Sequence, residues 1–278
     1  MDWKGREQSQ NVEDRRGSSG GGGGKAPGIL GIIVVLIGAY YGVDLSGLVG
    51  TPSMGTGSTQ TSQLKPQEEA ELNELARVVL ADTEKAWGSY FKQIGRTYTP
   101  TTMVLYNGGT STACGMGQSA MGPFYCPGDQ KVYLDLDFYR DMQTKLNSAS
   151  DAAFAYVIAH EVGHHVQNLL DILPKVHRMQ QQVGKKEANA LSVKLELQAD
   201  CYAGIWGHYA VNNNIFKAED ITKAMLAAES VGDDRLQKEG QGYVVPDSFT
   251  HGSSEQRMAW LKRGLESGDI NQCNTFGN

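Results

Sequence analysis

An uncharged apolar run near the amino terminus is the feature that most limits how this chain can fold. Residues 27–43 contain no charged side chain, and the first charge after them is Asp44. The run has 17 residues, the lower limit for a membrane-spanning helix, and residues 45–49 can lengthen it if Asp44 lies at the interface. We therefore predict a transmembrane anchor over residues 27–49. The alternatives are a buried core helix and the apolar part of a cleaved signal peptide.

The segments that flank this run differ from it and from each other. Residues 1–26 carry charges of both signs and end in a glycine and serine tract, a composition that predicts a disordered leader. Residues 50–65 are rich in Thr, Ser and Gly and are expected to form a linker, so the globular domain covers residues 66–278. Five basic residues precede the run and none follows it before Lys65, so the positive-inside rule places the leader in the cytoplasm and exports the domain.

The overall composition excludes several classes of protein. Of the 278 residues, 40% are hydrophobic and 20% are charged, which fits neither a disordered chain nor a protein with many membrane spans. The formal net charge of -6 argues against nucleic acid as a partner, because nucleic-acid binding needs a basic face. The sequence leaves the oligomeric state open.

The four cysteines all follow the apolar run, which fits an exported domain. Cys114 and Cys126 lie in one glycine-rich loop, so a local disulfide is their simplest pairing. Cys201 and Cys273 would then join the carboxy-terminal tail to a central helix. Four cysteines allow three pairings. A structural zinc site and buried free thiols are the alternatives, although the lack of a short Cys-x-x-Cys pair disfavours the zinc site.

The pattern of apolar residues predicts an α+β domain that is mostly helical, with a small sheet near its start. A short apolar run over residues 102–106 predicts one strand, and strict alternation over 131–137 predicts a second, half-buried strand in antiparallel pairing. Helices are expected over residues 66–90, 137–146, 152–170, 189–211, 218–231 and 254–265.

A His-Glu-Val-Gly-His sequence, the HExxH motif, lies within a strongly apolar helical segment. Residues four apart on a helix share one face, so His160 and His164 can bind the same metal ion. Glu161 lies about 100° further round the helix. Its carboxylate is therefore placed beside the metal, where it can act as a general base on water. Gly163 suggests a close approach of another backbone. The alternative is a pair of core histidines.

A catalytic zinc ion normally has three protein ligands and an open position for water, so a third ligand is needed. The extended motif with a third histidine is absent, because residue 170 is Leu. A later helix carries Glu196 and Asp200 one turn apart among apolar residues. Glu196 can supply the third ligand, and Asp200 can accept the free ring N–H of a ligand histidine and fix its orientation. The alternative, an exposed acidic helix face, is disfavoured by the apolar neighbours.

Four segments together resemble the bacterial family of putative neutral zinc metallopeptidases. They are HEVGHHVQN (160–168), LELQADCYAG (195–204), GPFYCPGDQKVYLD (122–135) and THGSSEQR (250–257). The likeness covers the leader, the apolar run and essentially all of the domain. The HExxH and ExxAD elements are also similar to those of HtpX-like membrane peptidases of the gluzincin type.

The resemblance implies a zincin-like fold, in which the active-site helix lies beneath an edge strand. It implies one Zn2+ ion bound by His160, His164 and Glu196, with Glu161 as the catalytic base and Asp200 as the partner of a ligand histidine. In a bacterium, the predicted topology gives a single-pass protein of the inner membrane, with the amino terminus in the cytoplasm and the domain in the periplasm.

The resemblance also implies where substrate would bind. Extended substrate would add to the strand over 131–137 by β-augmentation. The substrate-binding residues expected there are Tyr133, Leu134 and Asp135. His251 is a candidate for stabilising the oxyanion, and the alternative is a loop histidine before a helix cap.

These features predict a membrane-anchored zinc metalloendopeptidase that cleaves peptides or proteins with zinc-activated water and Glu161 as general base. One alternative is a membrane-tethered envelope binding or assembly protein that retains an inactive metallo-fold. Another is a metalloenzyme that hydrolyses something other than peptides. Chelator-sensitive peptide cleavage would distinguish the first hypothesis from the second.

Overall fold

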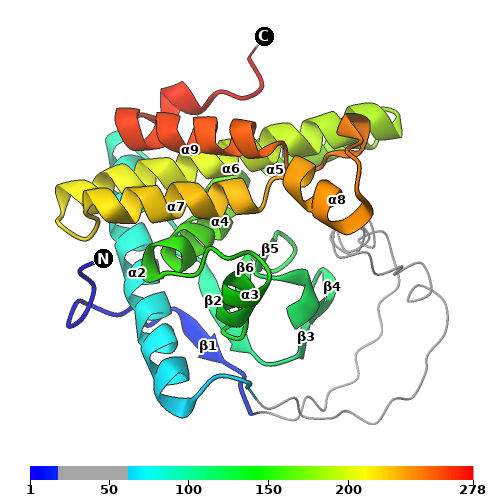
Figure 1. Ribbon diagram of the computed structural model, residues 1–278. Helices are drawn as coiled ribbons and strands as arrows, with labels where there is room; N and C mark the ends of the chain where they lie inside the picture. Colours follow the sequence, from blue (N-terminus) through cyan, green and yellow to red (C-terminus); the bar gives the residue numbers. More distant parts are fainter. Residues whose placement is uncertain (18–61, 278) are drawn as a thin grey trace.

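The structure, a computed structural model, describes residues 1–17 and 62–277. A small sheet and its neighbouring hairpin form one part, and a stack of helices forms the other (Figure 1). The strands are β1 (Val12–Asp14), β2 (Thr102–Tyr106), β3 (Gly109–Thr112), β4 (Gly115–Gln118), β5 (Phe124–Cys126) and β6 (Lys131–Asp135). The prediction of an α+β fold, mostly helical with a small sheet, is confirmed.

The described helices include every one that the sequence predicts for residues 66–278. They are α2 (Pro66–Gln93), α3 (Phe138–Thr144), α4 (Asp151–Leu169), α5 (Ile172–Gln180), α6 (Lys185–Asn212), α7 (Ala218–Ser230), α8 (Asp233–Gln241) and α9 (Ser254–Ser267). Short 3-10 turns are η2 (Ser119–Met121), η3 (Pro246–Ser248) and η4 (Ile270–Cys273). Helices α5 and α8 were not predicted, because nine residues each are too few for a clear helical period.

The main sheet has the strand order β1-β2-β6-β5. β1 pairs with β2 and β2 with β6 in parallel, whereas β5 pairs with β6 antiparallel. β3 and β4 form a separate antiparallel hairpin. β6 is therefore an inner strand with a neighbour on each side, and β5 is the outer strand on the side of α4, which it contacts.

The prediction that the strand at 131–137 is half-buried is wrong. Leu134 points into the main core, as the alternation predicts. On the opposite face Tyr133 is also buried, in a second cluster that includes Tyr106 and Cys126 and is bordered by Phe124. The alternation is visible in the sequence, but the layer that covers the second face comes from separate short segments that show no period.

The prediction of a disordered leader is wrong for residues 1–17, which are part of the fold. Trp3 is only 3% exposed and its indole N–H donates to Asp151 over 2.7 Å. The amino-terminal ammonium group lies 2.8 Å from Asp220. Arg16 forms an ion pair with Glu69 on α2. Several of the charges that suggested a solvated tail instead pair with charges on the domain.

Residues 1–17 also bear on the predicted topology. Because β1 pairs with β2, the leader and the domain lie together, which does not fit a single crossing that separates them. Residues 18–61, with the predicted anchor at 27–49, lie outside the described residues. Within residues 1–17 and 62–277, no helix has the length and apolar character needed to cross a membrane. The membrane location stays a prediction.

Helix α4 lies at the centre of the molecule and contacts α2, α6, α7 and β5. Gly163 permits one of these contacts, because a Cβ there would lie 3.1 Å from the carbonyl oxygen of Ala199 on α6. The predicted close approach at this glycine is confirmed. Helices α6 and α9 meet even more tightly, since a Cβ on Gly204 or Gly264 would overlap the backbone of the other helix.

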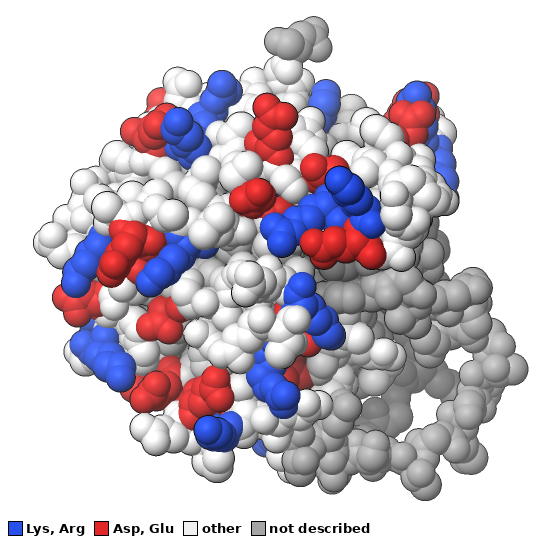
Figure 2. Space-filling view, in the orientation of Figure 1, with Lys and Arg blue, Asp and Glu red and all other residues white. Residues whose placement is uncertain are grey.

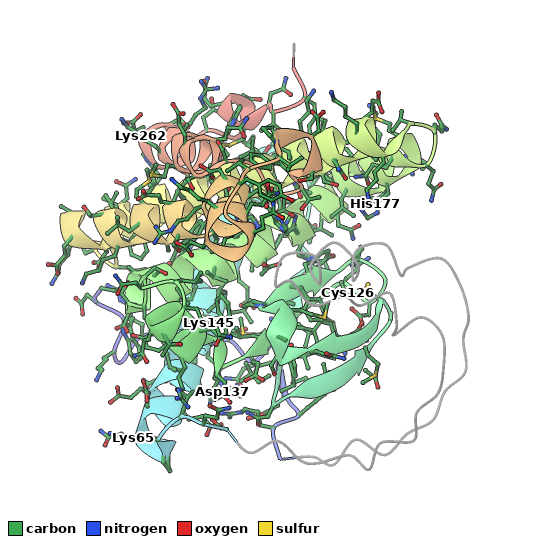
Figure 3. All side chains as sticks on the ribbon, turned by 45° about the vertical axis from the view of Figure 1, so that its right-hand side comes forward. Lys65, Cys126, Asp137, Lys145, His177 and Lys262 are labelled. Atoms are coloured by element: carbon green, nitrogen blue, oxygen red, sulfur yellow. A yellow bond between two sulfur atoms is a disulfide. The ribbon has the colours of Figure 1, made fainter. Side chains whose placement is uncertain are left out.

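Both expected disulfides are present. Cys114–Cys126 joins the β3–β4 turn to the end of β5, and Figure 3 shows Cys126 at the sheet. Cys201–Cys273 joins α6 to the carboxy-terminal turn η4. On the face drawn in Figure 2, acidic and basic side chains are interspersed.

Candidate metal centre

Helix α4 places both motif histidines on one face. Its first turn is capped by the Ser150 side chain, which accepts the backbone N–H of Ala153 over 3.0 Å. The rings of His160 and His164 lie 4.8 Å apart, one turn after the other, as the spacing predicts. His160 is buried and His164 is partly buried.

Helix α6 brings Glu196 to these two rings. One carboxylate oxygen lies 3.1 Å from His160 Nε2 and the other lies 3.4 Å from His164 Nε2. One ligand atom from each of the three residues lies within 4.8 Å of the other two. In a tetrahedral zinc site with bonds of about 2.0–2.1 Å, ligand atoms lie about 3.3 Å apart. The two observed separations, each to a different oxygen of Glu196, are close to that distance.

The chemistry of the donor atoms also calls for a cation. Asp200 can only accept a hydrogen bond, so His160 donates to it from Nδ1 over 2.8 Å, and Nε2 is the ring nitrogen left for other partners. This Nε2 faces a Glu196 oxygen at 3.1 Å. Two acceptors at this distance repel each other unless a proton or a metal ion lies between them. The residues therefore fit a zinc ion.

The partner of His160 belongs to a buried charged network. Arg257 on α9 holds both oxygens of Asp200, over 2.9 and 3.0 Å. The Tyr156 hydroxyl donates to the same carboxylate over 2.6 Å. Burial alone would raise the pKa of Asp200, but Arg257 and His160 hold this pKa at about 2. Asp200 is thus a fixed anion, in the place that the sequence predicts for the orienting carboxylate.

The partner of His164 is neutral. His164 Nδ1 lies 2.9 Å from the side-chain oxygen of Gln167, one turn later on α4. The Gln167 amide donates in turn to the Leu195 carbonyl and to Gln198 on α6. Sequence reasoning missed both Gln167 and Arg257. The available signal was a polar side chain three residues after a ligand histidine in an otherwise apolar helix.

Glu161 lies in the same cleft as the three candidate ligands. Its carboxylate has no hydrogen-bond partner in the part of the chain that the structure describes, and it is buried. Burial raises the pKa of Glu161, although the neighbouring histidines oppose this shift. A buried carboxylate with a raised pKa has the proton affinity that a general base needs.

His251 also lines the cleft, and its loop is fixed by Asp233 at the start of α8. One oxygen of Asp233 accepts the backbone N–H groups of Thr250, His251 and Gly252, over 2.7 to 3.0 Å. Its other oxygen lies 3.3 Å from His251 Nδ1. Burial alone would lower the pKa of His251, but Asp233 raises it. The arrangement provides a positioned proton donor.

The predicted substrate-binding residues Tyr133, Leu134 and Asp135 are not at the cleft. All three are buried, and they lie on β6, which is paired on both sides. The Asp135 carboxylate accepts the backbone N–H groups of Gly108 and Asp137, a structural role. Among the described strands, β5 is the one that lines the cleft and pairs on one side only. The order of the strands in the sheet decides that β5 has an unpaired edge and β6 has none, and no local sequence pattern encodes this order.

The other histidines lie outside the cluster of ligand atoms. His165 is fully buried and links three segments, since Nε2 is 2.7 Å from the Thr99 carbonyl and Nδ1 is 3.0 Å from the Tyr125 hydroxyl on β5. His177 lies on α5, away from the sheet, as Figure 3 shows. His208 lies 2.9 Å from the Leu265 carbonyl through Nδ1.

Apolar side chains line much of the cleft around the candidate ligands. They are Met121, Phe124, Phe138, Leu146, Val157 and Val231. The cavity volume is about 180 Å³. A cleft with an apolar lining and a few convergent polar groups is typical of a site that binds an organic substrate.

Comparison with known proteins places the chain in a family. The model of the family described as "Putative neutral zinc metallopeptidase" matches residues 1–276. "Uncharacterized protein YpfJ" of Escherichia coli K12 is 52% identical over 287 residues, which cover 100% of this chain and 99% of the relative. An uncharacterized protein of Mycobacterium tuberculosis H37Rv is 40% identical over 222 residues, which cover 74% and 73%. No solved structure matches the chain. The chain belongs to the family of putative neutral zinc metallopeptidases.

Proposed function

We propose that this protein is a zincin-like zinc metallopeptidase that cleaves peptide bonds at the site between α4 and α6. The observation that carries the proposal is the convergence of His160, His164 and Glu196 in a geometry that fits zinc, with Glu161 in the same cleft. The family to which the chain belongs supports the same reaction class.

His160, His164 and Glu196 would hold the ion, and Glu161 would move the proton. A bound zinc ion would supply a Lewis acid and lower the pKa of the attacking water. Glu161 takes a proton from this water as it attacks the scissile carbonyl, and then delivers the proton to the leaving amine. The burial that raises the pKa of Glu161 favours both halves of this transfer.

His251, which lines the same cleft, would donate a hydrogen bond to the oxyanion that develops on the carbonyl oxygen. Asp233 fixes the loop through three backbone N–H groups, so the ring needs no rearrangement when charge develops. Asp233 also raises the pKa of His251, which favours the protonated, donating form. We therefore assign His251 the role of oxyanion donor.

Strand β5 takes the role first predicted for the strand at 131–137. An extended peptide can add to its open edge by main-chain hydrogen bonds, since the described structure pairs β5 with β6 alone. The bond from Tyr125 to His165 holds β5 against the helix that carries the histidines. The apolar lining of the cleft favours a peptide with a large apolar side chain next to the scissile bond.

The test compares the full-length protein with Glu161→Gln. We expect the parent to cleave casein and a mixed peptide library in a chelator-sensitive manner. Glu161→Gln should keep one zinc ion per chain and lose at least about 100-fold in rate, because the proton acceptor is gone. Glu219→Gln, on the exposed first turn of α7, is the matched control and should be fully active.

Two outcomes would overturn the proposal. If Glu161→Gln cleaves at the parental rate, the assignment of the base is wrong. If the parent holds zinc but cleaves no peptide in the library, the activity itself is wrong. The second outcome would favour a binding or assembly protein that retains a metallo-fold.

A further inference from the structure

A chain of side-chain amides connects the metal centre to the carboxy-terminal tail. His164 Nδ1 lies 2.9 Å from the oxygen of Gln167, whose nitrogen lies 3.0 Å from the oxygen of Gln198. The nitrogen of Gln198 lies 3.0 Å from the carbonyl oxygen of Cys273. Gln167 is 0% exposed and Gln198 is 5% exposed, so solvent cannot replace these bonds.

Two backbone carbonyls set the direction of this chain. The Leu195 carbonyl can only accept, so the NH2 group of Gln167 must face it, at 2.8 Å. The Cys273 carbonyl likewise requires the NH2 group of Gln198. The oxygen of Gln198 is then left for Gln167, and the oxygen of Gln167 is left for His164. If either amide group rotated by 180°, it would place a donor against a donor or an acceptor against an acceptor.

The direction of these hydrogen bonds decides which ring nitrogen of His164 carries the proton. An oxygen opposite Nδ1 requires a proton on Nδ1, which leaves the lone pair on Nε2, the atom that faces Glu196. A reversed Gln167 would place NH2 opposite Nδ1 and move the ring proton to Nε2. His164 could then not bind a metal through that atom.

The end of this amide series that lies furthest from the metal centre is held in place by a disulfide. Cys273 is bonded to Cys201 on α6, and Thr275 donates to the Lys194 carbonyl over 2.6 Å. The tail is therefore held on the same helix that carries Glu196. Nothing else in the zinc mechanism uses the tail or this disulfide.

We propose that Gln167 and Gln198 are positioning residues that lock His164 in its metal-binding form, and that the carboxy-terminal tail, held by Cys201–Cys273, anchors them. This inference rests on the proposed function, because it assumes that zinc binds at His160, His164 and Glu196. It makes the tail, about 75 residues away from Gln198 in sequence, a contributor to zinc affinity.

The test measures the zinc dissociation constant of full-length variants by competition with a chelator. We expect Gln167→Met to weaken zinc binding by about 10- to 100-fold and Gln198→Met by a smaller factor of at least about threefold. Replacing both Cys201 and Cys273 by Ser should resemble Gln198→Met. The visible spectrum of the Co2+-loaded protein should change in each variant, because ligand geometry changes.

Gln180→Met is the matched control. Gln180 also bridges to α6, through the Ala188 carbonyl and Ser192, but it has no bond to the metal centre. It should lower stability and leave both the zinc dissociation constant and the Co2+ spectrum unchanged.

The inference is overturned if Gln167→Met and Gln198→Met bind zinc within twofold of the parent and keep the parental Co2+ spectrum. If Gln167→Met does not fold, Gln198→Met, which lies one step further from the ligand, decides the question alone. A parent that binds no zinc would instead refute the proposed function, so the two failures are distinguishable.

Discussion

The two candidate histidine ligands are held in different ways. His160 is hydrogen-bonded to Asp200, which forms an ion pair with Arg257 on α9. His164 is instead hydrogen-bonded to a neutral amide, Gln167, which is connected through Gln198 to the carboxy-terminal tail. A buried ion that loses its partner is penalised much more than a buried amide that loses one. The charged side should therefore dominate the stability of the fold, and the neutral side should affect mainly the metal.

The largest expected effect comes from breaking the charged side at Arg257. Arg257→Met leaves the Asp200 carboxylate, which is fully buried, without its cation. We expect the free energy of unfolding to fall by about 3–5 kcal/mol, measured by urea denaturation at pH 7. Arg263→Met, an exposed change on the same helix, is the control and should change it by about 0.5 kcal/mol or less. A loss below about 1 kcal/mol for Arg257→Met would contradict the comparison.

A second prediction tests the packing that brings α9 to the charged side. A Cβ at Gly264 would overlap the carbonyl oxygen of Cys201, next to Asp200. Gly264→Ala should destabilise the fold by about 3 kcal/mol, because backbone cannot move aside as a side chain can. Thermal unfolding checks this. An unchanged melting temperature would show that the two helices are not in such close contact.

The third prediction removes the charge but keeps the shape. Asp200→Asn leaves Arg257 unpaired and gives His160 a weaker acceptor. We expect zinc affinity to fall by about 10- to 100-fold, measured by chelator competition. The loss should accompany a lower stability, unlike that of Gln167→Met, where zinc affinity changes more than stability does. If the two variants lose zinc affinity and stability in the same proportion, the proposed difference between the partners of His160 and His164 is wrong.

The smallest effect concerns a buried carboxylate without an arginine. Asp82 has the Trp206 indole N–H as its partner, and burial raises its pKa to about 6, although that bond opposes the shift. A raised folded pKa means that its contribution to stability is present below about 3.8 and is lost as the pH rises through 6. Asp82→Asn should thus stabilise the fold by on the order of 1 kcal/mol at pH 8 and by almost nothing at pH 4. A pH-independent difference would contradict this. Asp200 has its pKa lowered to about 2, so the pH dependence of its contribution has the opposite sign. The stability that Asp200 gives the fold is lost as the pH falls through 2.

Local spacing was sufficient to predict the inner part of the site. The helical period places His160 beside His164, and the buried one-turn spacing of Glu196 and Asp200 places both acids opposite them. Arg257 could not be found in this way, because its pairing with Asp200 depends on how α9 crosses α6. That crossing depends on glycines far apart in the sequence.

The sheet and the leader show the same limit. The alternation over 131–137 correctly predicts a strand, but only strand order reveals that β6 is inner and that β5 offers the open edge. Residues 1–17 look solvated by composition, yet Trp3 and the ion pair of Arg16 fix them to the domain. Both errors come from tertiary partners that no local pattern records.

The most direct test of the zinc peptidase account is cleavage measured against zinc occupancy. The full-length protein is freed of metal with a chelator, and zinc is returned in steps while bound zinc and peptide cleavage are recorded in the same samples. The account predicts that cleavage is absent without zinc and rises in proportion to occupancy until one ion is bound per chain. Full cleavage by the metal-free protein, or one bound zinc with no cleavage of any peptide, would contradict it.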